Sequence, residues 1–378
     1  MKILSVVAGL LIDDARSRRI ININNLLLSL GHEVHLVQYV RKSIWQEHRG
    51  NSVDLGAFDH SVVFSSRFCA NLKHICVLSK GNYNLMLGNA YGGTFWSILG
   101  KFKLPLIYDM HGLVAEEHRL NFGSSLNPQT TANFFAKAYI EQLGMRFSDS
   151  IICVSEKMMT YLKTQKKIPA KKTHYVTNGV DLDLFKQAAD QDVQVLKRQL
   201  GIEGKFVFGY IGELQKWQGV ENFVDAAKRI DNEKTVFIVI GGRNGQIQKT
   251  KNFLLIPRVN YNRVPLYSSI CDVLVLPRPS HPATEVAAPT KFAEYTAMRK
   301  PILTTKVGDA ANLVAQYNCG LIVKNNAIST LLGGIRQFMQ TSTNTLREMG
   351  NNSRKLAETE FDWNKIKWNL RKAVDLNF

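Results

Sequence analysis

Short apolar runs that alternate with helix-like segments constrain the fold of this chain more than any other feature. The runs of the first half fit buried strands at 3–7, 34–37, 62–64, 83–87, 106–108, 151–154 and 174–176. After a polar stretch, a second series follows at 206–211, 236–240, 253–256, 273–276, 301–304 and 320–323. Strands that alternate with helices form parallel sheets covered on both faces. The sequence therefore predicts an α/β protein with two doubly wound, Rossmann-like parallel-sheet domains.

The repetition of this pattern also predicts the domain boundaries. A chain of 378 residues can hold two domains of about 100 to 200 residues each. We expect an N-terminal domain at 1–183, a C-terminal domain at 184–355 and a tail at 356–378. The tail carries apolar residues at helical spacing: Trp363, Ile366, Leu370 and Val374. Because ligands of such sheets bind beyond the carboxyl ends of the strands, we expect a ligand cleft between the two domains.

The chain is strongly basic, with 48 Lys and Arg against 31 Asp and Glu and a formal net charge of +17. This excess favours an anionic partner, which can be nucleic acid, a phospholipid surface or a phosphorylated small molecule. A nucleic-acid-binding protein is the weaker alternative, because the basic residues are spread over both halves without a reading motif. The densest basic run fits either a solvated helix end or a lipid-headgroup patch. It consists of Lys163, Lys166, Lys167, Lys171 and Lys172.

Cysteine usage and the first residues indicate a compartment. The five cysteines are odd in number, scattered and mostly within apolar runs, which is typical of reduced core residues: Cys69, Cys76, Cys153, Cys271 and Cys319. An apolar strand begins at Lys2, so we expect no signal peptide, and no apolar run reaches the ~18 residues of a membrane span. We expect a cytoplasmic protein whose membrane contact is at most peripheral, at the anionic cytoplasmic face.

The segment 289–301, PTKFAEYTAMRKP, joins a short helix, an acid and a sharp stop. Proline at 289 suits a helix entry, and proline at 301 ends the helix. The N-H groups of Thr290 and Lys291 at the helix start can bind a phosphate. Glu294, one turn after Lys291, can accept hydrogen bonds from ribose hydroxyls. The alternative is an ordinary surface helix with a solvated acid.

This segment resembles the P-x-K-x-x-E-Y-x-A donor-site helix of the family 4 retaining glycosyltransferases (glycosyl transferases group 1), which have the two-domain GT-B fold. Further matches follow in the correct order between Asp109 and Trp363, including DMHG at 109–112 and the hinge NGVDLDLF at 178–185. The resemblance implies a hexosyltransferase that moves a sugar from a UDP- or GDP-linked donor to a glycan, lipid-linked or other acceptor. In this family a tail like 356–378 crosses back onto the first domain. A nucleotide-sugar epimerase of the same fold is the alternative.

The strand and turn FVFGYIG at 206–212 resemble the start of the family's donor domain. Gly212 allows the backbone to approach a ligand closely. The family often has arginine where this chain has Glu213 and lysine where it has Gln218, and these cations neutralise the donor diphosphate. A metal-free site needs cations from elsewhere. The candidates are Lys216 and Lys291, followed by Arg278 and Arg243.

Two glutamates separated by seven residues are usual around the donor-site helix of the family. Glu294 matches the second, whereas the first falls on Val286, one residue after Glu285. A local bulge would bring Glu285 into the catalytic position, and the alternative is a solvated loop acid. Arg299 replaces the glycine common before Lys-Pro, which costs about 1 to 2 kcal/mol if the position is left-handed.

In the first domain, His111 follows directly after a predicted strand. A lone histidine there is more often hydrogen-bonded structure than chemistry. In the family, however, the histidine of D-x-H-G faces the transferred sugar. The resemblance therefore implies that His111 positions a donor hydroxyl and supports charge at the reacting carbon, while Asp109 orients the imidazole or the strand end.

The first strand-to-helix connection, residues 8–19, lies beside the acceptor in the family. Gly9 can allow close approach, and Arg16 and Arg18 can hold an acceptor phosphate, although a charged helix start explains them equally well. The triplet 181–183, DLD, imitates the metal-binding D-x-D of other glycosyltransferases, but the preceding Asn-Gly turn indicates a structural hinge. We expect no catalytic metal and no cofactor, since the nucleotide sugar is a substrate.

Overall fold

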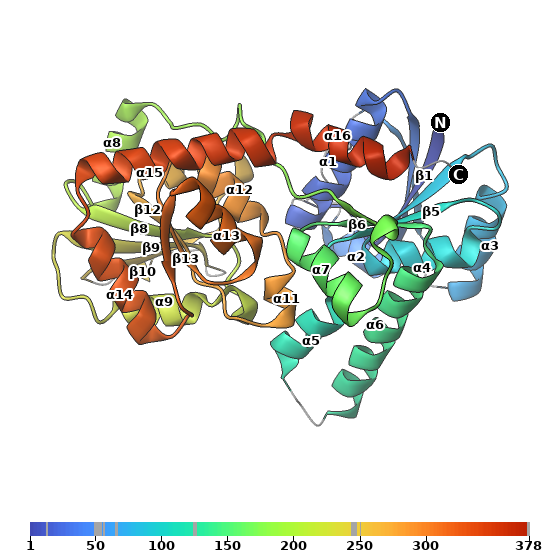
Figure 1. Cartoon of the computed structure of the whole chain (residues 1–378), viewed down its shortest axis with the longest axis horizontal. Coiled ribbons are helices and arrows are strands. Elements are labelled where there is room, and N and C mark those ends of the chain that lie inside the picture. The colour runs from blue at the N-terminus through green and yellow to red at the C-terminus, as the bar shows by residue number, and fades with distance from the viewer. Residues whose placement is uncertain are drawn as a thin grey trace. The chain divides into compact units, whose positions relative to one another are not determined.

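The computed structural model describes residues 1–12, 14–48, 55, 57–64, 67–123, 127–242, 248–249 and 251–375. The chain forms two compact units (Figure 1). Unit 1 comprises Met1–Thr177 and Trp363–Phe378, and unit 2 comprises Asn178–Asp362. The chain thus leaves unit 1 six residues before the expected boundary at 183 and returns to it seven residues after the expected boundary at 355.

Unit 1 contains a seven-stranded sheet in the order β3-β2-β1-β4-β5-β6-β7, and every strand pair is parallel. The strands are β1 (Lys2–Ala8), β2 (Glu33–Val40), β3 (Asp59–Phe64), β4 (Leu85–Asn89), β5 (Leu106–Met110), β6 (Ser150–Cys153) and β7 (Thr173–Tyr175). The helices of the unit between them are α1 (Ala15–Ser29), α2 (Lys42–His48), α3 (Phe68–Leu78), α4 (Ala90–Gly100), α5 (Val114–Phe122), α6 (Pro128–Phe147), α7 (Glu156–Gln165) and the 3-10 turn η2 (Ala170–Lys172).

The tail forms α16 (Trp363–Val374), which packs against α1 in unit 1. Its buried side chains are Ile366, Leu370, Ala373 and Val374, which join the cluster that holds Ile20 and Ile23 of α1. Fully burying a leucine or isoleucine stabilises a fold by about 1.5 to 3 kcal/mol. The helical spacing of apolar residues in the tail therefore corresponds to one buried face.

Unit 2 contains a second seven-stranded sheet, in the order β10-β11-β9-β8-β12-β13-β14. Only β10 among these strands runs antiparallel to its neighbour. The strands are β8 (Phe206–Ile211), β9 (Thr235–Gly242), β10 (Gln248–Lys249), β11 (Phe253–Pro257), β12 (Val273–Leu276), β13 (Ile302–Thr305) and β14 (Gly320–Val323). The helices are α8 (Asp190–Leu200), α9 (Val220–Ala227), α10 (Val264–Ser269), α11 (Pro282–Glu285), α12 (Thr290–Ala297), α13 (Gly308–Tyr317), α14 (Ile328–Met339) and α15 (Thr343–Leu356), with the short turns η3 (Lys216–Gln218), η4 (Tyr261–Arg263) and η5 (Ala357–Phe361).

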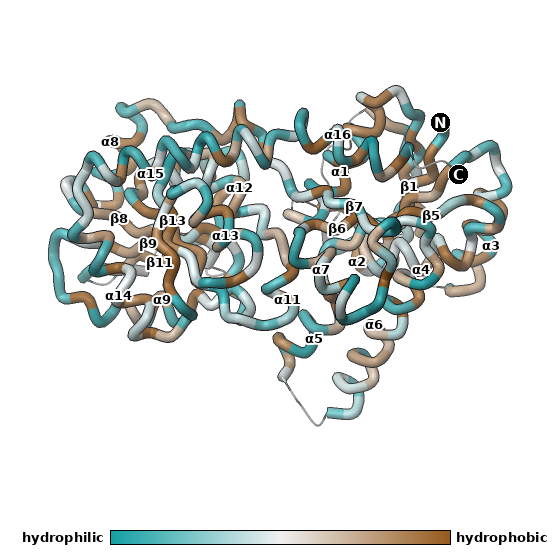
Figure 2. Tube along the Cα trace, in the orientation of Figure 1, coloured by the Kyte–Doolittle hydropathy of each residue, from teal (hydrophilic) through white to brown (hydrophobic). Residues whose placement is uncertain are grey.

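Central strands such as β1 and β9 are hydrophobic (Figure 2) and supply buried clusters of the two units, whereas the outer strands β3, β7 and β10 carry polar residues. The predicted fold class, two doubly wound parallel-sheet domains, is confirmed. Among the strands in the described ranges, only the two-residue β10 was not predicted. The strand order reverses between β1 and β4 in unit 1 and between β8 and β12 in unit 2. Ligands of open α/β sheets bind at the carboxyl ends of the strands beside such a reversal. The residues that follow β1, β4, β8 and β12 are therefore the expected ligand-binding positions of the two units.

Candidate functional site

Helix α12 begins at Thr290, with Pro289 in the extended conformation before it. Tyr295 fixes this helix to the end of β8. The Ile211 N-H donates to Tyr295 Oη at 2.8 Å, and the Tyr295 hydroxyl donates to the Ile211 carbonyl at 3.1 Å. Burial raises the pKa of Tyr295 well above its ordinary value, so the hydroxyl stays a neutral donor. The amino end of α12, with its unsatisfied N-H groups, is thereby held at the carboxyl end of the sheet.

Lys291 is a buried amine in the first turn of α12, with 9% of the residue exposed. Its Nζ donates to Tyr210 Oη at 2.6 Å and to Gln218 Oε1 at 3.0 Å, and both acceptors are neutral. Burial is the main reason why the pKa of Lys291 falls to about 7, and the nearby Arg278 lowers it further. A buried amine whose hydrogen bonds end on neutral oxygens gains much from an anion placed beside it.

Gly212 makes room for this amine. The residue has φ +143, and a Cβ atom there would lie 2.6 Å from Lys291 Nζ. The φ value is one that side chains rarely adopt, so the position favours glycine for two separate reasons. In the structure, the group that comes close to the Gly212 backbone is the Lys291 amine.

Arg278 follows β12 and is 3% exposed. Its guanidinium carbon lies 5.0 Å from the centroid of the Trp217 ring, and its charge lowers the pKa of Lys291. Lys216, by contrast, is exposed in η3. Arg243 lies outside the described residues. Unit 2 thus brings two buried cations, Arg278 and Lys291, to the edge of the sheet where α12 begins.

Glu294 lies one turn further along α12 and is half-buried. Its Oε1 accepts a hydrogen bond of 2.9 Å from the Tyr261 hydroxyl of η4. The carboxylate is therefore oriented by a tyrosine on the same edge of unit 2.

Glu285 caps a helix in the structure. Its Oε2 accepts a hydrogen bond of 2.9 Å from the N-H of Gly308, the first residue of α13, and its Oε1 accepts one of 2.9 Å from Ser280 Oγ. A carboxylate at a helix amino end is favoured by the helix dipole. Val286, at the position where the family carries its first glutamate, is 2% exposed.

Arg299 has φ +54, so this position is left-handed. The residue is separated from the end of α12 by Met298 and is exposed. At such a left-handed position, a residue other than glycine costs about 1 to 2 kcal/mol of stability.

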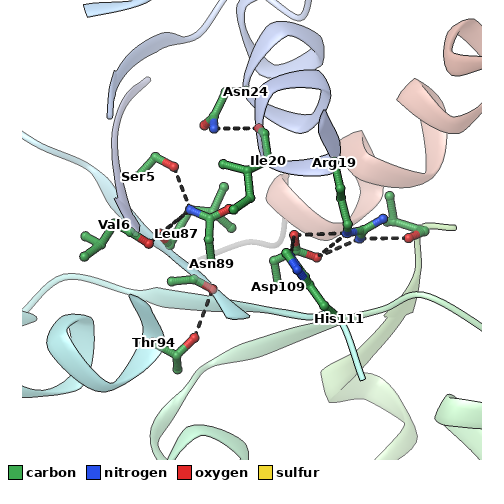
Figure 3. A network of polar contacts seen from close by, with 12 residues as sticks. Ser5, Val6, Arg19, Ile20, Asn24, Leu87, Asn89, Thr94, Asp109 and His111 are labelled. Carbon is green, nitrogen blue, oxygen red and sulfur yellow. Dashed lines mark hydrogen bonds and ion pairs between the residues drawn. The ribbon is translucent and has the colours of Figure 1, made fainter. Parts of the chain in front are cut away.

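Asp109, at the end of β5, joins two other side chains of unit 1 (Figure 3). Its Oδ1 lies 2.6 Å from Arg19 Nη2, and its Oδ2 lies 2.8 Å from His111 Nε2. Arg19 also donates to the carbonyls of Val176 at 3.0 Å and Thr177 at 3.1 Å. Asp109 is fully buried and Arg19 is 3% exposed, whereas the His111 side chain is 17% exposed.

The charges of this group favour an ionised carboxylate. Burial alone would raise the pKa of Asp109, but Arg19 and His111 outweigh burial and hold that pKa well below its usual range. The Asp109 carboxylate is thus available at neutral pH to orient His111 through Nε2. The sequence does not predict that Arg19 pairs with Asp109. Its only hint is that the charged Arg19 stands immediately before Ile20, an apolar residue that is buried in α1.

The loop after β1 is also held in place by an arginine. Gly9 has φ +113, and its N-H donates to the Tyr39 carbonyl at 2.9 Å. Arg16 Nη2 donates to the Leu10 carbonyl at 3.1 Å and lies 3.6 Å from the position of a Cβ on Gly9. Arg18 lies half-buried in the first turns of α1. Gly9 and Arg16 are therefore neighbours in space.

The segment after unit 1 is a tight turn. The Asp181 carboxylate accepts hydrogen bonds from the N-H groups of Asp183 at 3.0 Å and Leu184 at 2.9 Å. Asn178 Nδ2 donates to the Ala288 carbonyl at 2.6 Å, just before α12. Among the described residues, no three His, Cys, Asp or Glu side chains are grouped so that they could hold a metal ion. No helix in the described ranges is long and apolar enough to cross a membrane.

Comparisons with known proteins identify the family. Residues 192–356 match the family described as "Glycosyl transferases group 1", and residues 17–184 match the family described as "Glycosyltransferase Family 4". WcaI of Escherichia coli K12, named for colanic acid biosynthesis, is 25% identical over 53% of this chain and 51% of its own length. CapM of Staphylococcus aureus, named for capsular polysaccharide biosynthesis, is 23% identical over 62% of this chain and 63% of its own length. The matched region thus spans between half and two thirds of the length of each of these relatives.

Solved structures agree with this fold. The Anabaena protein HepE, crystallised with UDP-glucose, has a TM-score of 0.75 at 18% identity, with 99% of both chains covered. WaaG, a glycosyltransferase involved in lipopolysaccharide biosynthesis, has a TM-score of 0.71 at 14% identity, covering 99% of this chain and 100% of that one. The two parallel-sheet units are those of the GT-B fold. The chain belongs to the family of the glycosyl transferases group 1.

Proposed function

We propose that the protein is a retaining glycosyltransferase that moves a hexose-type sugar from a nucleotide-sugar donor to an acceptor, without a metal. The observation that carries the proposal is the buried pair Lys291 and Arg278 at the amino end of α12. Two desolvated cations beside unsatisfied helix N-H groups stabilise a diphosphate far better than exposed lysines do. The same groups would stabilise the leaving nucleoside diphosphate during transfer.

The donor contacts follow from this placement. Lys291 would exchange its neutral acceptors for phosphate oxygens, and the N-H groups of Thr290 and Lys291 would hold the same diphosphate. Lys216, being exposed, would reach the diphosphate only from the solvent side. Glu294, already aligned by Tyr261, would accept hydrogen bonds from the ribose hydroxyls. HepE and its UDP-glucose complex favour UDP over GDP as the nucleotide.

His111 would contact the transferred sugar. Asp109 fixes its Nε2, so Nδ1 is the nitrogen left for a sugar hydroxyl or for the developing charge at the reacting carbon. Both carboxylate oxygens of Glu285, in contrast, accept hydrogen bonds, one from Ser280 and one from Gly308. Its role in catalysis would therefore be to position the amino end of α13 beside the sugar. The departing phosphate itself would take the acceptor proton, as the family resemblance implies.

The acceptor would bind unit 1 at the loop after β1. Gly9, which has no side chain, would let the acceptor approach the backbone, and Arg16 and Arg18 would bind a phosphate of the acceptor. The names of the relatives WcaI and CapM favour a glycan or lipid-linked acceptor. We place the enzyme in the cytoplasm, at the anionic face of a membrane, which the net charge of +17 supports.

A thermal-shift screen against UDP, GDP and their sugars tests this function. The wild type should be stabilised by one of these nucleotides, by about 2.7 kcal/mol at a hundredfold excess over Kd. Glu294→Ala should respond less, because the ribose contact is lost. NMR analysis of the products then separates transfer from epimerisation, since an epimerase changes the sugar of the donor without an acceptor. A wild type that responds to none of the nucleotides contradicts the proposal.

A further inference from the structure

The edge of the unit 1 sheet where its strands begin is unusually basic. The neighbouring strands β4, β5, β6 and β7 are preceded by residues 79–84, 101–105, 148–149 and 166–172. Because parallel strands begin at the same edge of a sheet, these four segments lie next to one another. They contain seven lysines and one acid, Asp149; the lysines are Lys80, Lys101, Lys103, Lys166, Lys167, Lys171 and Lys172.

Side-chain contacts hold the middle of this edge together. Lys80 Nζ lies 5.8 Å from the centroid of the Phe102 ring. Lys101 Nζ donates to the Phe147 carbonyl at 2.9 Å and to Asp149 at 3.2 Å, so the one acid is already paired. These contacts join the α4–β5 loop to the end of α6.

The same surface continues onto the last turn of α6. The guanidinium carbon of Arg146 lies 5.6 Å from the centroid of the Phe147 ring, and Lys172 Nζ donates to the Met145 carbonyl at 2.7 Å. We call this region the amino-edge surface and define it by Lys80, Lys101, Phe102, Lys103, Arg146 and Phe147.

The aromatic side chains of the amino-edge surface are exposed. Phe102 is 69% exposed and stands between two lysines in sequence, and Phe147 is 45% exposed. Phenylalanine rings in water lack the stabilisation that burial provides. A group of exposed rings therefore indicates a surface that binds a membrane or another molecule. In unit 2, by contrast, the exposed large hydrophobic residues that the structure describes are aliphatic: Val195, Leu214 and Ile322.

Helix α6 extends the surface along one face. Phe135 and Tyr139, which are 64% and 63% exposed, lie four residues apart, and Arg146 follows seven residues later, so the three share a face. The one acid of α6, Glu141, is 4% exposed and accepts a hydrogen bond of 2.7 Å from the Val114 N-H. The outward face of α6 therefore carries aromatic and basic groups without an exposed acid, which is the pattern of an interfacial helix.

We infer that the amino-edge surface, continued by α6, docks on an anionic phospholipid membrane. Aromatic rings lie favourably at the headgroup level of a bilayer, and each lysine near an anionic leaflet strengthens the binding. Phe102 between Lys101 and Lys103 supplies both contributions on one short loop. His111 and Gly9 follow the carboxyl ends of strands in the same unit, at the edge of the sheet opposite to Lys101, Phe102 and Lys103. The inference rests on the proposed function only for the lipid-linked or membrane-borne acceptor that makes docking useful.

Vesicle flotation of the full chain tests this docking. The probes are vesicles of phosphatidylcholine alone and of phosphatidylcholine mixed with phosphatidylglycerol. The wild type should float with the anionic vesicles and much less with the neutral ones. The double variant F102S/K103E should lose at least about tenfold in affinity for the anionic vesicles, since it removes one aromatic anchor and reverses one charge. The matched variant W368S/K372E alters an exposed aromatic and an exposed lysine on α16 and should bind like the wild type.

Insertion can be read separately with F102W, whose added fluorescence should be quenched by brominated anionic lipid. Equal flotation of F102S/K103E and the wild type, or equal binding to neutral and anionic vesicles, would overturn the inference. So would release of the protein from vesicles by random-sequence RNA at equal charge, which would identify a nucleic acid as the preferred partner. UDP-induced thermal shifts should be the same in F102S/K103E and the wild type. If neither the wild type nor the variants showed a UDP-induced shift, the proposed function would be contradicted and the docking result would still stand.

Discussion

A Cβ atom on Gly212 would lie 2.6 Å from Lys291 Nζ, so the missing side chain at Gly212 is what allows the amine to reach Tyr210 and Gln218. Gly212 follows β8, and Lys291 lies in the first turn of α12, which Tyr295 holds against Ile211. The position of the amine therefore depends on the packing of α12 on β8.

The substitution Gly212→Ala tests this dependence. The new methyl group would displace the amine, and we expect the affinity for a UDP-sugar to fall at least about tenfold, the loss of one charge-assisted hydrogen bond. Gly204→Ala is the matched control, because Gly204 also has a positive φ, +66, but no atom within 4 Å of its Cβ position. Titration calorimetry should show unchanged affinity for Gly204→Ala. Equal affinities for the two variants would show that the amine and the ligand are independent.

The sequence could predict the strands of both sheets and the buried face of α16, because periodicity carries that information. Local motifs also singled out Gly212 and Lys291, which the structure places next to each other. The sequence could not predict the partners that lie far apart in the chain. Arg19 pairs with Asp109 across 90 residues, and Glu285 caps α13 across 23 residues. Such contacts depend on how strands and helices are ordered in space, and no local pattern records them.

The binding of UDP should depend on pH through Lys291. Its pKa of about 7 in the free protein means that the amine is largely neutral at higher pH, whereas a bound diphosphate favours the charged form. Affinity should therefore fall as pH rises above 7, by up to about tenfold per unit. Binding should take up a proton, which calorimetry in buffers of different ionisation enthalpy measures. Lys291→Met should abolish this dependence, and a flat affinity between pH 7 and 9 in the wild type would contradict it.

The same pKa has a consequence for stability without ligand. The folded-state pKa of Lys291 lies below its ordinary value of 10.5, so the unfolded state binds more protons between pH 7 and 10.5. The contribution of this group to the free energy of unfolding should therefore rise with pH in that window and stay constant below it. Urea unfolding of the wild type and Lys291→Met at several pH values measures the difference. A wild type that loses stability relative to Lys291→Met as pH rises from 7 would refute this assignment.

Arg299→Gly should stabilise the protein by about 1 kcal/mol, because glycine adopts φ +54 without the strain of a Cβ atom. Arg299→Ala is the control, since alanine keeps the Cβ atom and should bring no such gain. The midpoint of urea unfolding reports both changes. If alanine stabilised the chain as much as glycine, the arginine side chain rather than its backbone would be the source of strain.

Asp109→Asn should destabilise unit 1 by about 3 to 5 kcal/mol, because it leaves the buried guanidinium of Arg19 without its carboxylate. His111→Gln should change stability far less, since the side chain is partly exposed, but should lower the rate of sugar transfer. Thermal unfolding and a transfer assay on both variants separate the two effects. A stable Asp109→Asn protein would show that the ion pair does not support the fold.

The central claim is that Lys291 binds the diphosphate of a nucleotide sugar. Calorimetric titration of UDP-glucose into the wild type, Lys291→Met and the control Lys228→Met tests it most directly, because Lys228 is a surface lysine with 64% of its side chain exposed. We predict that Lys291→Met loses about tenfold to a hundredfold in affinity, the range of one to two charge-assisted hydrogen bonds, while Lys228→Met binds like the wild type. Equal affinity of Lys291→Met and the wild type would contradict the claim.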